Sequence, residues 1–414
     1  MISVFTPSHN TRFLKAAYQS LLAQSHTDWE WVILLNGPAE RIHLPFADRR
    51  VRFERCEKFA GIGELKAIAV SKCKGDILVE LDHDDMLMPD ALAAVWTVFA
   101  INKNVVFTYS DTAQIDEDGN PDPSEFSADH GWTYYQDNGY KTASSFKPYP
   151  HNISYIWYAP NHLRAFRRSA YEFAGGYDRS LTVLDDQDLM TRLYQIGGFH
   201  HIKKCLYLQR VHAGNTQRDP ETNAKIQQQT VQMYYTDIEA NALAWTRRKR
   251  LLALDLGAFH GKPSDYKGVD MREGPGVDYV GDFLDLDLPD NSVGVIRAVD
   301  FLEHVPNRIG VMEKIWRLLE HGGMLLSETP STDGRGAWQD PTHVSGWNEN
   351  SFWYFCDDRY RKYIESDAKF HVSRLETYFP SEWHQAHNIS YVRANLVAIK
   401  TPHTHDFGGL STAV

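Results

Sequence analysis

Short apolar runs alternate with helix-like segments through the first hundred residues of this 414-residue chain, and this alternation restricts the fold more than any other feature. Strands are expected at residues 2–6, 30–35 and 77–81, with helices near 11–25 and 62–73 between them. Such an order predicts an α/β fold in which helices cover a parallel sheet. Ligands of parallel sheets bind at the carboxyl ends of the strands, so a functional site is expected at that edge.

Polar residues follow each of these three predicted strands. Pro7 to Asn10 follow the first strand, Asn36-Gly37-Pro38 follows the second, and Asp82-His83-Asp84 follows the third. Because the carboxyl ends of parallel strands meet at one edge, the three polar segments are expected to converge on one crevice.

The third strand ends in an unusual concentration of negative charge. Asp82, Asp84 and Asp85 occupy three of four successive positions directly after the apolar run that begins at Ile77. Carboxylates beside a buried strand are unfavourable unless a cation accompanies them, and Mg²⁺ or Mn²⁺ would take such oxygen ligands together with substrate phosphates. The alternative is a solvated acidic turn before a helix that starts near Pro89.

Composition restricts the class of protein. A formal charge of −11 argues against a protein that holds long nucleic acid through a basic face, and the Thr246 to Arg250 run is interpreted as the solvated end of a helix. Four cysteines without a Cys-x-x-Cys pair fit a reducing compartment, so a cytoplasmic location is expected. The chain shows neither a secretory signal nor an uncharged apolar run of about 18 residues, so no membrane span is expected.

The length favours two domains. The first is expected to span residues 1–220, with irregular loops between 105 and 160 that shape an acceptor cleft. A helical linker is expected at 221–250 and a second α/β domain at 251–400, which leaves a tail at 401–414.

The first 218 residues resemble a family 2 glycosyltransferase of the GT-A fold. The resemblance rests on segments in a fixed order: Val4–Asn10, Ser20–Ser25 with Asp28–Glu30, Asp82–Asp85, Tyr109–Asp111, Asp116–Gly119, Gly175–Asp178, and Asp185–Leu189 before Arg192 and Leu193.

This resemblance implies a nucleotide-diphosphate sugar, preferably a UDP-sugar, as the donor and Mn²⁺ or Mg²⁺ as the cofactor. The implied donor-binding residues are Thr6, Pro7, Asn10, Asn36, Lys66, Asp82 and His83, and the implied metal ligands are Asp82, Asp84 and His212. A divalent ion at these carboxylates would stabilise the departing diphosphate as a Lewis acid.

Three of these assignments have alternatives. Asn36 stands where the family usually has an aspartate, so the base of the nucleotide stays open. Lys66 would either face the diphosphate or be a solvated helix lysine. His212, in a segment that resembles the family's closing Arg-x-His, would either complete the metal site or be structural.

The Asp185-Asp186 pair resembles the family's catalytic Glu-Asp motif. An inverting transferase needs a carboxylate base for the acceptor hydroxyl, and the resemblance assigns that role to Asp186 with Asp185 as its partner. Like-charge proximity is expected to raise the pKa of one of the two, and a plain helix N-terminus is the alternative. Asn161 and His162 are expected near the acceptor.

The second domain resembles a class I methyltransferase with a Rossmann-like fold. The implied S-adenosylmethionine contacts are Asp255, Gly257, Asp270 and Asp282, and Leu302–Val305 and Leu318–Gly323 complete the order of motifs.

Two departures weaken the expectation of methylation in this domain. Phe259 occupies a glycine position of the usual loop, and too few residues separate the first two strands for a full crossover helix. The alternative is a domain that positions acceptors or holds a dimer together. Asp340–His343 and Trp347–Phe355 either line its pocket or close its core.

The sequence therefore predicts a metal-dependent, inverting glycosyltransferase. The acceptor stays open among a glycan, a lipid-linked sugar, a protein, a small metabolite and a modified nucleobase. The competing hypotheses are a methyltransferase acting on a glycosylated substrate, a bifunctional glycosyl and methyl transferase, and a non-catalytic sugar-nucleotide scaffold. A homo-oligomer is possible in each case.

Overall fold

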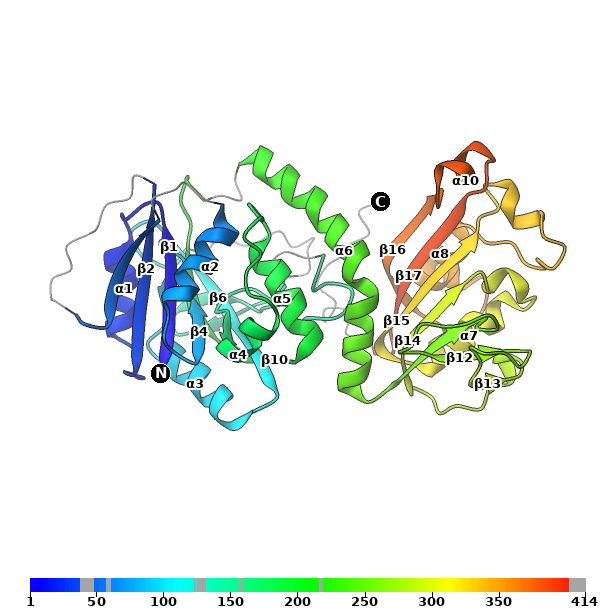
Figure 1. Cartoon of the computed structure of the whole chain (residues 1–414), viewed down its shortest axis with the longest axis horizontal. Helices are drawn as coiled ribbons and strands as arrows, with labels where there is room; N and C mark the ends of the chain where they lie inside the picture. Colours follow the sequence, from blue (N-terminus) through cyan, green and yellow to red (C-terminus); the bar gives the residue numbers. More distant parts are fainter. Residues whose placement is uncertain are drawn as a thin grey trace. The chain divides into compact units, whose positions relative to one another are not determined.

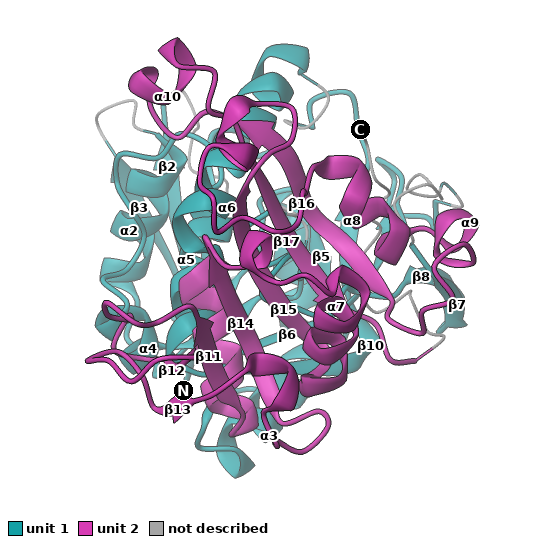
Figure 2. Ribbon diagram, turned by 90° about the vertical axis from the view of Figure 1, so that its right-hand side faces the viewer, with its two compact units in different colours: residues 1–238, 405–411 teal, residues 239–404, 412–414 magenta. Residues whose placement is uncertain are grey.

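The structure is a computed structural model, and it describes residues 1–37, 48–56, 61–122, 124, 132–155, 159–215 and 219–401. Pro38 and the predicted tail beyond Thr401 lie outside the described residues. The described chain divides into two compact units, residues 1–238 and 239–401, coloured teal and magenta in Figure 2. Each unit is built around its own β-sheet.

The first unit alternates strands and helices as the sequence predicts (Figure 1). Its elements are β1 (Ile2–Ser8), α1 (Leu14–Leu22), β2 (Trp29–Asn36), β3 (Val51–Cys56), α2 (Ile62–Lys72), β4 (Ile77–Glu80), β5 (Met86–Leu87), α3 (Ala91–Ile101), β6 (Val105–Ile115), β7 (Tyr134–Asp137), β8 (Tyr140–Ala143), β9 (Ala165–Arg167), α4 (Arg168–Phe173), α5 (Asp185–Ile196), β10 (Gly198–Arg210) and α6 (Pro220–Lys249).

The first sheet has the strand order β3-β2-β1-β4-β9-β6-β10-β5, and β8 pairs with both β6 and β7. Strands β1 to β4 run parallel, β9 is antiparallel to β4 and β6, and β10 is parallel to β6. The carboxyl ends of β1, β2, β4, β6 and β10 therefore face the same edge of the sheet. The start of the reversed strand β9 also lies at this edge.

A tryptophan ties three of these strands together near that edge. The Trp31 indole donates a hydrogen bond to the Thr6 hydroxyl at 2.8 Å, and this hydroxyl donates to the Leu81 carbonyl at 2.6 Å. Trp31 and Thr6 are both fully buried. A buried hydroxyl that accepts one bond and donates another is well satisfied, so these contacts fix the strand ends on which the polar segments stand.

The predicted elements of the first hundred residues are confirmed, with ends that shift by a few residues. The short elements that were not predicted include the edge strand β3, the strand β5 and the hairpin formed by β7 and β8. The linker region forms one helix, α6, whose residues Arg247 to Lys249 are exposed at its end, as expected for that basic run. In the described part of the chain, no helix has the length and apolar character needed to cross a membrane.

The second unit also contains a mainly parallel sheet. Its elements are β11 (Leu252–Leu256), β12 (Lys267–Asp270), β13 (Tyr279–Val280), β14 (Val293–Val299), α7 (Arg308–Leu318), β15 (Leu319–Pro330), α8 (Glu349–Cys356), α9 (Asp358–Arg361), β16 (Phe370–Tyr378), α10 (Glu382–Ala386) and β17 (Tyr391–Ala398), with 3-10 turns at Phe283–Asp285, Leu302–His304 and Arg335–Trp338. The strand order is β13-β12-β11-β14-β15-β17-β16, and β17 is antiparallel to both neighbours. Figure 2 shows α7 and α8 on one face of this sheet.

The connection from β11 to β12 contains no helix, as its length predicts. The chain after β12 instead returns over this connection at close range. A Cβ atom at Gly276 would lie 2.1 Å from the Ala258 carbonyl oxygen, so only glycine fits there. The later aromatic stretch closes the core, because Trp347, Phe352 and Phe355 are all buried in the second apolar cluster.

Candidate functional site

The polar segments after β1 and β4 meet at the edge of the first sheet. The His9 and His83 rings contact each other with centroids 4.9 Å apart. Burial lowers the pKa of His83, and the nearby Asp84 carboxylate opposes this effect. At least these two of the polar segments that follow the strands therefore lie together at this edge of the sheet.

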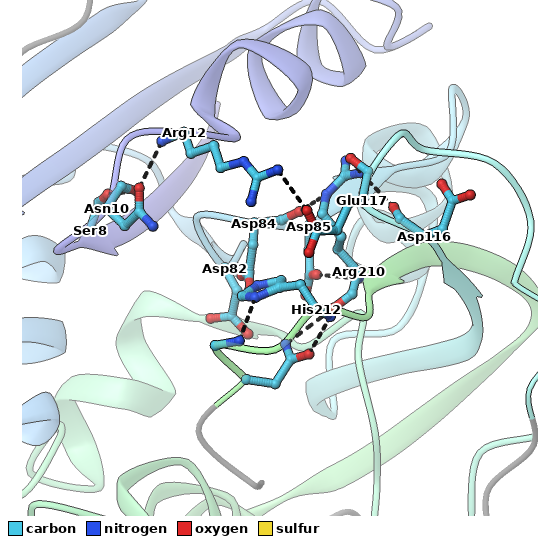
Figure 3. A network of polar contacts seen from close by, with 12 residues as sticks. Ser8, Asn10, Arg12, Asp82, Asp84, Asp85, Asp116, Glu117, Arg210 and His212 are labelled. Carbon is cyan, nitrogen blue, oxygen red and sulfur yellow. Dashed lines mark hydrogen bonds and ion pairs between the residues drawn. The ribbon is translucent and has the colours of Figure 1, made fainter. Parts of the chain in front are cut away.

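The acidic cluster after β4 is linked to the segment after β10, as Figure 3 shows. His212 Nε2 lies 2.8 Å from Asp84 Oδ2, and the Gly214 amide donates to His212 Nδ1 at 3.1 Å. A neutral ring that accepts at Nδ1 carries its proton on Nε2. In this conformation His212 Nε2 therefore donates a hydrogen bond to Asp84 and has no lone pair available for a metal ion.

Arg210 holds the loops of this edge together (Figure 3). Its backbone amide donates to Asp85 Oδ1 at 2.7 Å, and its Nε donates to the Asp84 carbonyl at 2.7 Å. Its Nη1 donates to the carbonyls of Asp116 and Glu117 at 2.8 and 2.9 Å. Arg210 is 2% exposed, so it acts as an internal connector between the ends of β4, β6 and β10.

The three aspartates of the cluster have different environments. Asp85 is 3% exposed and turned into the protein, where burial and the charges of Asp84 and Asp82 raise its pKa well above the usual range. The Asp82 side chain is 41% exposed, and its nearest ionisable contact is His162 Nε2 at 3.7 Å. The protein packed around Asp82, together with Glu80 and Asp84, raises its pKa to about 7.

These environments fit a divalent ion held by Asp82 and Asp84. A raised carboxyl pKa means that negative charge is poorly compensated, and a cation would compensate it. Mg²⁺ commonly uses one or two carboxylates and leaves its other positions to phosphates and water. The ligand atoms of Asp82, Asp84 and His212 do not all lie within 4.8 Å of one another. Among the described residues, three potential ligands meet this condition in the second unit.

Lys66 does not have either of its predicted environments. It is 6% exposed, and its ammonium group pairs with Glu80 on β4 and, at 2.8 Å, with Asp185 on α5. Burial alone would lower the pKa of Lys66, but Asp185 and Glu80 outweigh it and raise this pKa well above the usual value. Lys66 is therefore an internal ion-pair partner that joins α2, β4 and α5, neither solvated nor free to meet a diphosphate.

The two acids at the start of α5 are driven in opposite directions. Burial raises the pKa of Asp185 to about 6, with Asp186 adding to the rise and Lys66 opposing it. Burial would also raise the pKa of Asp186, but the charges of Arg164 and Lys66 outweigh it and lower this pKa to about 2. The rise in pKa that was expected from the neighbouring charges therefore occurs at the buried Asp185. Asp186, the predicted base, is ionised at neutral pH.

Arg164, which lies in the segment expected near the acceptor, pairs with the predicted base, and the sequence did not predict this pairing. Its Nη1 pairs with Asp186, and Arg164 itself is 4% exposed. Two residues earlier, His162 stacks on Tyr207 with centroids 4.4 Å apart and approaches Asp82. Burial, followed by the charge of Arg164, lowers the pKa of His162 well below its usual value, so this ring is neutral.

The remaining predicted donor residues take two kinds of position. The Thr6 hydroxyl makes its hydrogen bonds inside the protein, to Trp31 and Leu81. Asn10 Oδ1 accepts from the Arg12 amide at 3.0 Å, and Pro7 is half-buried. Asn36 is 4% exposed, and no described residue donates a hydrogen bond to its Oδ1. Asn161 is buried, and its Oδ1 accepts from the His162 amide at 2.9 Å.

The predicted cofactor contacts of the second unit are partly occupied by the protein. Asp255 is 2% exposed and accepts from Arg297 Nη1 at 2.7 Å. Asp270 accepts from the amides of Phe259 and Arg272, and Asp282 accepts from the Leu284 amide. Gly257 turns with a φ of +81°, as a glycine loop requires.

Comparison with known proteins identifies the two parts. Residues 3–173 match the model of glycosyl transferase family 2, and residues 223–327 match the model of a methyltransferase domain. The matches confirm both resemblances that the sequence motifs suggested, and with them the α/β fold class of each unit.

The curated relatives that the chain matches include a chondroitin synthase and a hyaluronan synthase. The chain is 27% identical over 222 residues to chondroitin synthase of Escherichia coli, which covers 52% of this chain and 30% of that protein. It is 25% identical over 222 residues to hyaluronan synthase of Pasteurella multocida, which covers 52% of this chain and 21% of that protein. The chain thus spans less than a third of the length of these relatives.

Solved structures are similar at low identity. The S. aureus TarS 1–349 structure in complex with UDP-GlcNAc aligns with a TM-score of 0.44 and 11% identity, covering 59% of this chain and 70% of that chain. The same protein in complex with UDP aligns with a TM-score of 0.41 and 12% identity, with the same coverage of the two chains.

Replacement of Lys66 by methionine should destabilise the protein strongly. The change leaves Glu80 and Asp185 buried without their cation, and breaking such a pair costs about 3–5 kcal/mol. Denaturant unfolding measures the loss, and Lys72→Met on the exposed end of the same helix is the control. Unchanged stability with weaker binding of UDP would instead mean that Lys66 meets the diphosphate.

Replacement of Asp82 by asparagine should alter how stability depends on pH when a chelator is present. A carboxyl whose folded pKa is about 7 stabilises the folded state below its unfolded pKa near 4, and this contribution is lost as the pH rises through 7. The variant should therefore gain stability relative to the natural protein between pH 5 and pH 8.

Unfolding curves at several pH values measure this difference, and Asp118→Asn, which removes an exposed carboxylate, is the control. A constant difference between the Asp82 variant and the natural protein across this range would contradict the raised pKa.

Proposed function

We propose that the first unit, which carries a domain of glycosyltransferase family 2, transfers a sugar from a nucleotide-diphosphate sugar to an acceptor hydroxyl with inversion at the anomeric carbon. The observation that supports this proposal is the position of two kinds of carboxylate at one sheet edge. Asp82 and Asp84 are suited to a divalent ion, and Asp186 is suited to a base. His162 and Arg164, at the start of β9, lie between them.

A UDP-sugar is the preferred donor in this proposal. Asn36 Oδ1 is buried without a donor among the described residues, and such an atom is costly until a ligand supplies one. Uracil carries an N3–H group that can donate to an amide oxygen, whereas cytosine lacks this donor. Asn36 in place of the usual aspartate is therefore compatible with a uracil base.

Asp82 and Asp84 would hold Mn²⁺ or Mg²⁺. When bound, the ion supplies positive charge for the diphosphate that departs from the sugar. His212 keeps Asp84 oriented through the 2.8 Å contact, and Arg210 fixes the backbone of the same turn. These residues place the carboxylates where the donor phosphates are expected, at the carboxyl ends of the parallel strands.

Asp186 would act as the base. One of its oxygens takes the proton of the acceptor hydroxyl, the acceptor oxygen forms a bond to the anomeric carbon, and the bond from that carbon to the diphosphate oxygen breaks. The low pKa of Asp186 keeps it ionised but also makes it a weak base. Arg164 is the main cause, so an incoming diphosphate that attracts Arg164 would raise the basicity of Asp186.

The acceptor proposed is a hydroxyl of a glycan. Two relatives are named as synthases of chondroitin and hyaluronan, which are polysaccharides, although the chain covers only part of either. We infer a cytoplasmic location from the four cysteines, which lie far apart in the sequence without a Cys-x-x-Cys pair and fit a reducing compartment.

Replacement of Asp186 by asparagine should abolish transfer and preserve binding of UDP. Loss of a general base typically lowers the rate by about 10²–10⁴-fold, whereas the nucleotide contacts are made by other residues. Release of UDP from the donor measures the rate, and calorimetry measures UDP binding. Asp188→Asn is the matched control, since Asp188 lies in the same helical turn but pairs with Arg192.

The folded state of both variants is compared by thermal unfolding, because Arg164 loses its partner in the Asp186 variant. Transfer at the natural rate in a folded Asp186→Asn protein would exclude Asp186 as the base.

A further inference from the structure

A second candidate metal site lies in the methyltransferase-type unit. Glu303 and His304 belong to the 3-10 turn that follows β14, and His343 belongs to the segment before α8. One ligand atom from each of the three lies within 4.8 Å of the others. The turn follows the carboxyl end of a parallel strand, which is the edge where sheets of this type bind ligands.

Backbone hydrogen bonds hold the two segments together. The amides of Val344 and Ser345 donate to the Glu303 carbonyl at 2.8 and 3.0 Å. The Ser345 hydroxyl donates to the Leu302 carbonyl at 2.9 Å. The two segments that carry Glu303, His304 and His343 are therefore held together by the main chain and by the Ser345 hydroxyl.

Both histidines are oriented as metal ligands usually are. His343 Nδ1 lies 2.9 Å from the Ala337 carbonyl, and His304 Nδ1 lies 3.1 Å from the Thr342 carbonyl. A carbonyl oxygen can only accept, so each neutral ring carries its proton on Nδ1 and its lone pair on Nε2. Hydrogen bonding of one ring nitrogen to a backbone carbonyl is the typical support of a histidine that binds metal through the other.

Glu303 supplies a second, independent observation, a buried carboxylate oxygen to which no described residue donates a hydrogen bond. Its side chain is 1% exposed, and its Oε1 accepts no hydrogen bond from any described residue. His343 Nε2, which carries a lone pair, lies 4.0 Å from this oxygen and 4.0 Å from Asp340 Oδ2. These separations are too long for hydrogen bonds. Two ligands of a tetrahedral ion with bonds of about 2 Å lie about 3.3 Å apart, so a side-chain shift of less than about 1 Å would bring His343 Nε2 and these oxygens onto one ion.

We propose that Glu303, His304 and His343 bind a divalent transition-metal ion of the Zn²⁺ type, with Asp340 or water as a further ligand. Two imidazole nitrogens and one carboxylate favour such an ion over Mg²⁺ or Ca²⁺, which prefer oxygen ligands. His304 is exposed and Asp340 is half-exposed, so one side of the site is open to solvent. A three-ligand site with an open position can bind an oxygen atom of a substrate and polarise it.

Zn²⁺ binding to the full chain tests this site without any assay of activity. The test uses a background in which Asp82→Asn and Asp84→Asn remove the candidate ligands of the first unit. Equilibrium dialysis against Zn²⁺ should still give one bound ion per chain in this background. His304→Ala, Glu303→Gln and His343→Ala, each added to it, should weaken binding more than about tenfold.

His304→Ala is the decisive variant, because its exposed side chain can be removed without opening the core. The control is His387→Ala, which removes a histidine of the same unit outside the cluster and should leave Zn²⁺ binding unchanged. Co²⁺ bound in place of Zn²⁺ should show the intense visible bands of a site with few ligands and bound imidazole. His304→Ala should abolish these bands.

The opposite results are equally specific. A background protein that binds no Zn²⁺, or that binds it equally well after His304→Ala and His343→Ala, would overturn the proposal. Retention in His304→Ala with loss in His387→Ala would assign the ion to surface histidines and overturn it as well.

Discussion

Negative charge at the end of β4 is the constraint on which the first unit depends. Glu80, Asp82, Asp84 and Asp85 fall within six positions beside a buried strand, and burial of an uncompensated carboxylate costs several kcal/mol. The protein compensates most of this charge with its own groups. Lys66 pairs with Glu80, and His212 contacts Asp84. The Arg210 amide donates a hydrogen bond to Asp85, whose raised pKa favours the protonated form. Asp82 keeps the least compensation and the greatest exposure, which makes it the point where an added cation would matter most.

The same ion pairs that satisfy this charge also position Asp185 and Asp186, the acids to which our proposal gives a catalytic role. Lys66 joins Glu80 to Asp185, so the end of β4 and the start of α5 are held at a fixed separation. Asp186, the next residue, is thereby placed beside Arg164 at the start of β9. Stability and function are therefore coupled in this unit: groups that would be costly alone are tolerated because they neutralise one another. A donor that brings two phosphates and a metal ion would enter this balance at Asp82 and Arg164.

Local patterns in the sequence predicted the strands, the edge of the sheet that carries the polar segments, and the second α/β unit. They also predicted that His212 belongs with the acidic cluster, and the 2.8 Å contact with Asp84 agrees with this. They failed where a partner lies far away in the chain. Lys66 reads as an ordinary helix lysine because its partners on β4 and α5 are not adjacent in sequence, and Arg164 has no local signal of its pairing with Asp186. The edge strand β3 was missed because Arg52, Glu54 and Arg55 mask its alternating Val51 and Phe53.

The central claim is that these carboxylates turn over a nucleotide sugar with the help of a divalent ion. The most direct measurement is release of nucleoside diphosphate from a panel of UDP-, GDP- and dTDP-linked sugars, with Mn²⁺ and with excess chelator, using short glycans and water as acceptors. The account predicts that one UDP-sugar is consumed with Mn²⁺ and that the chelator stops this release. Consumption that continues in the chelator would contradict the role of Asp82 and Asp84, and tight binding of a donor without release would make the unit a sugar-nucleotide scaffold.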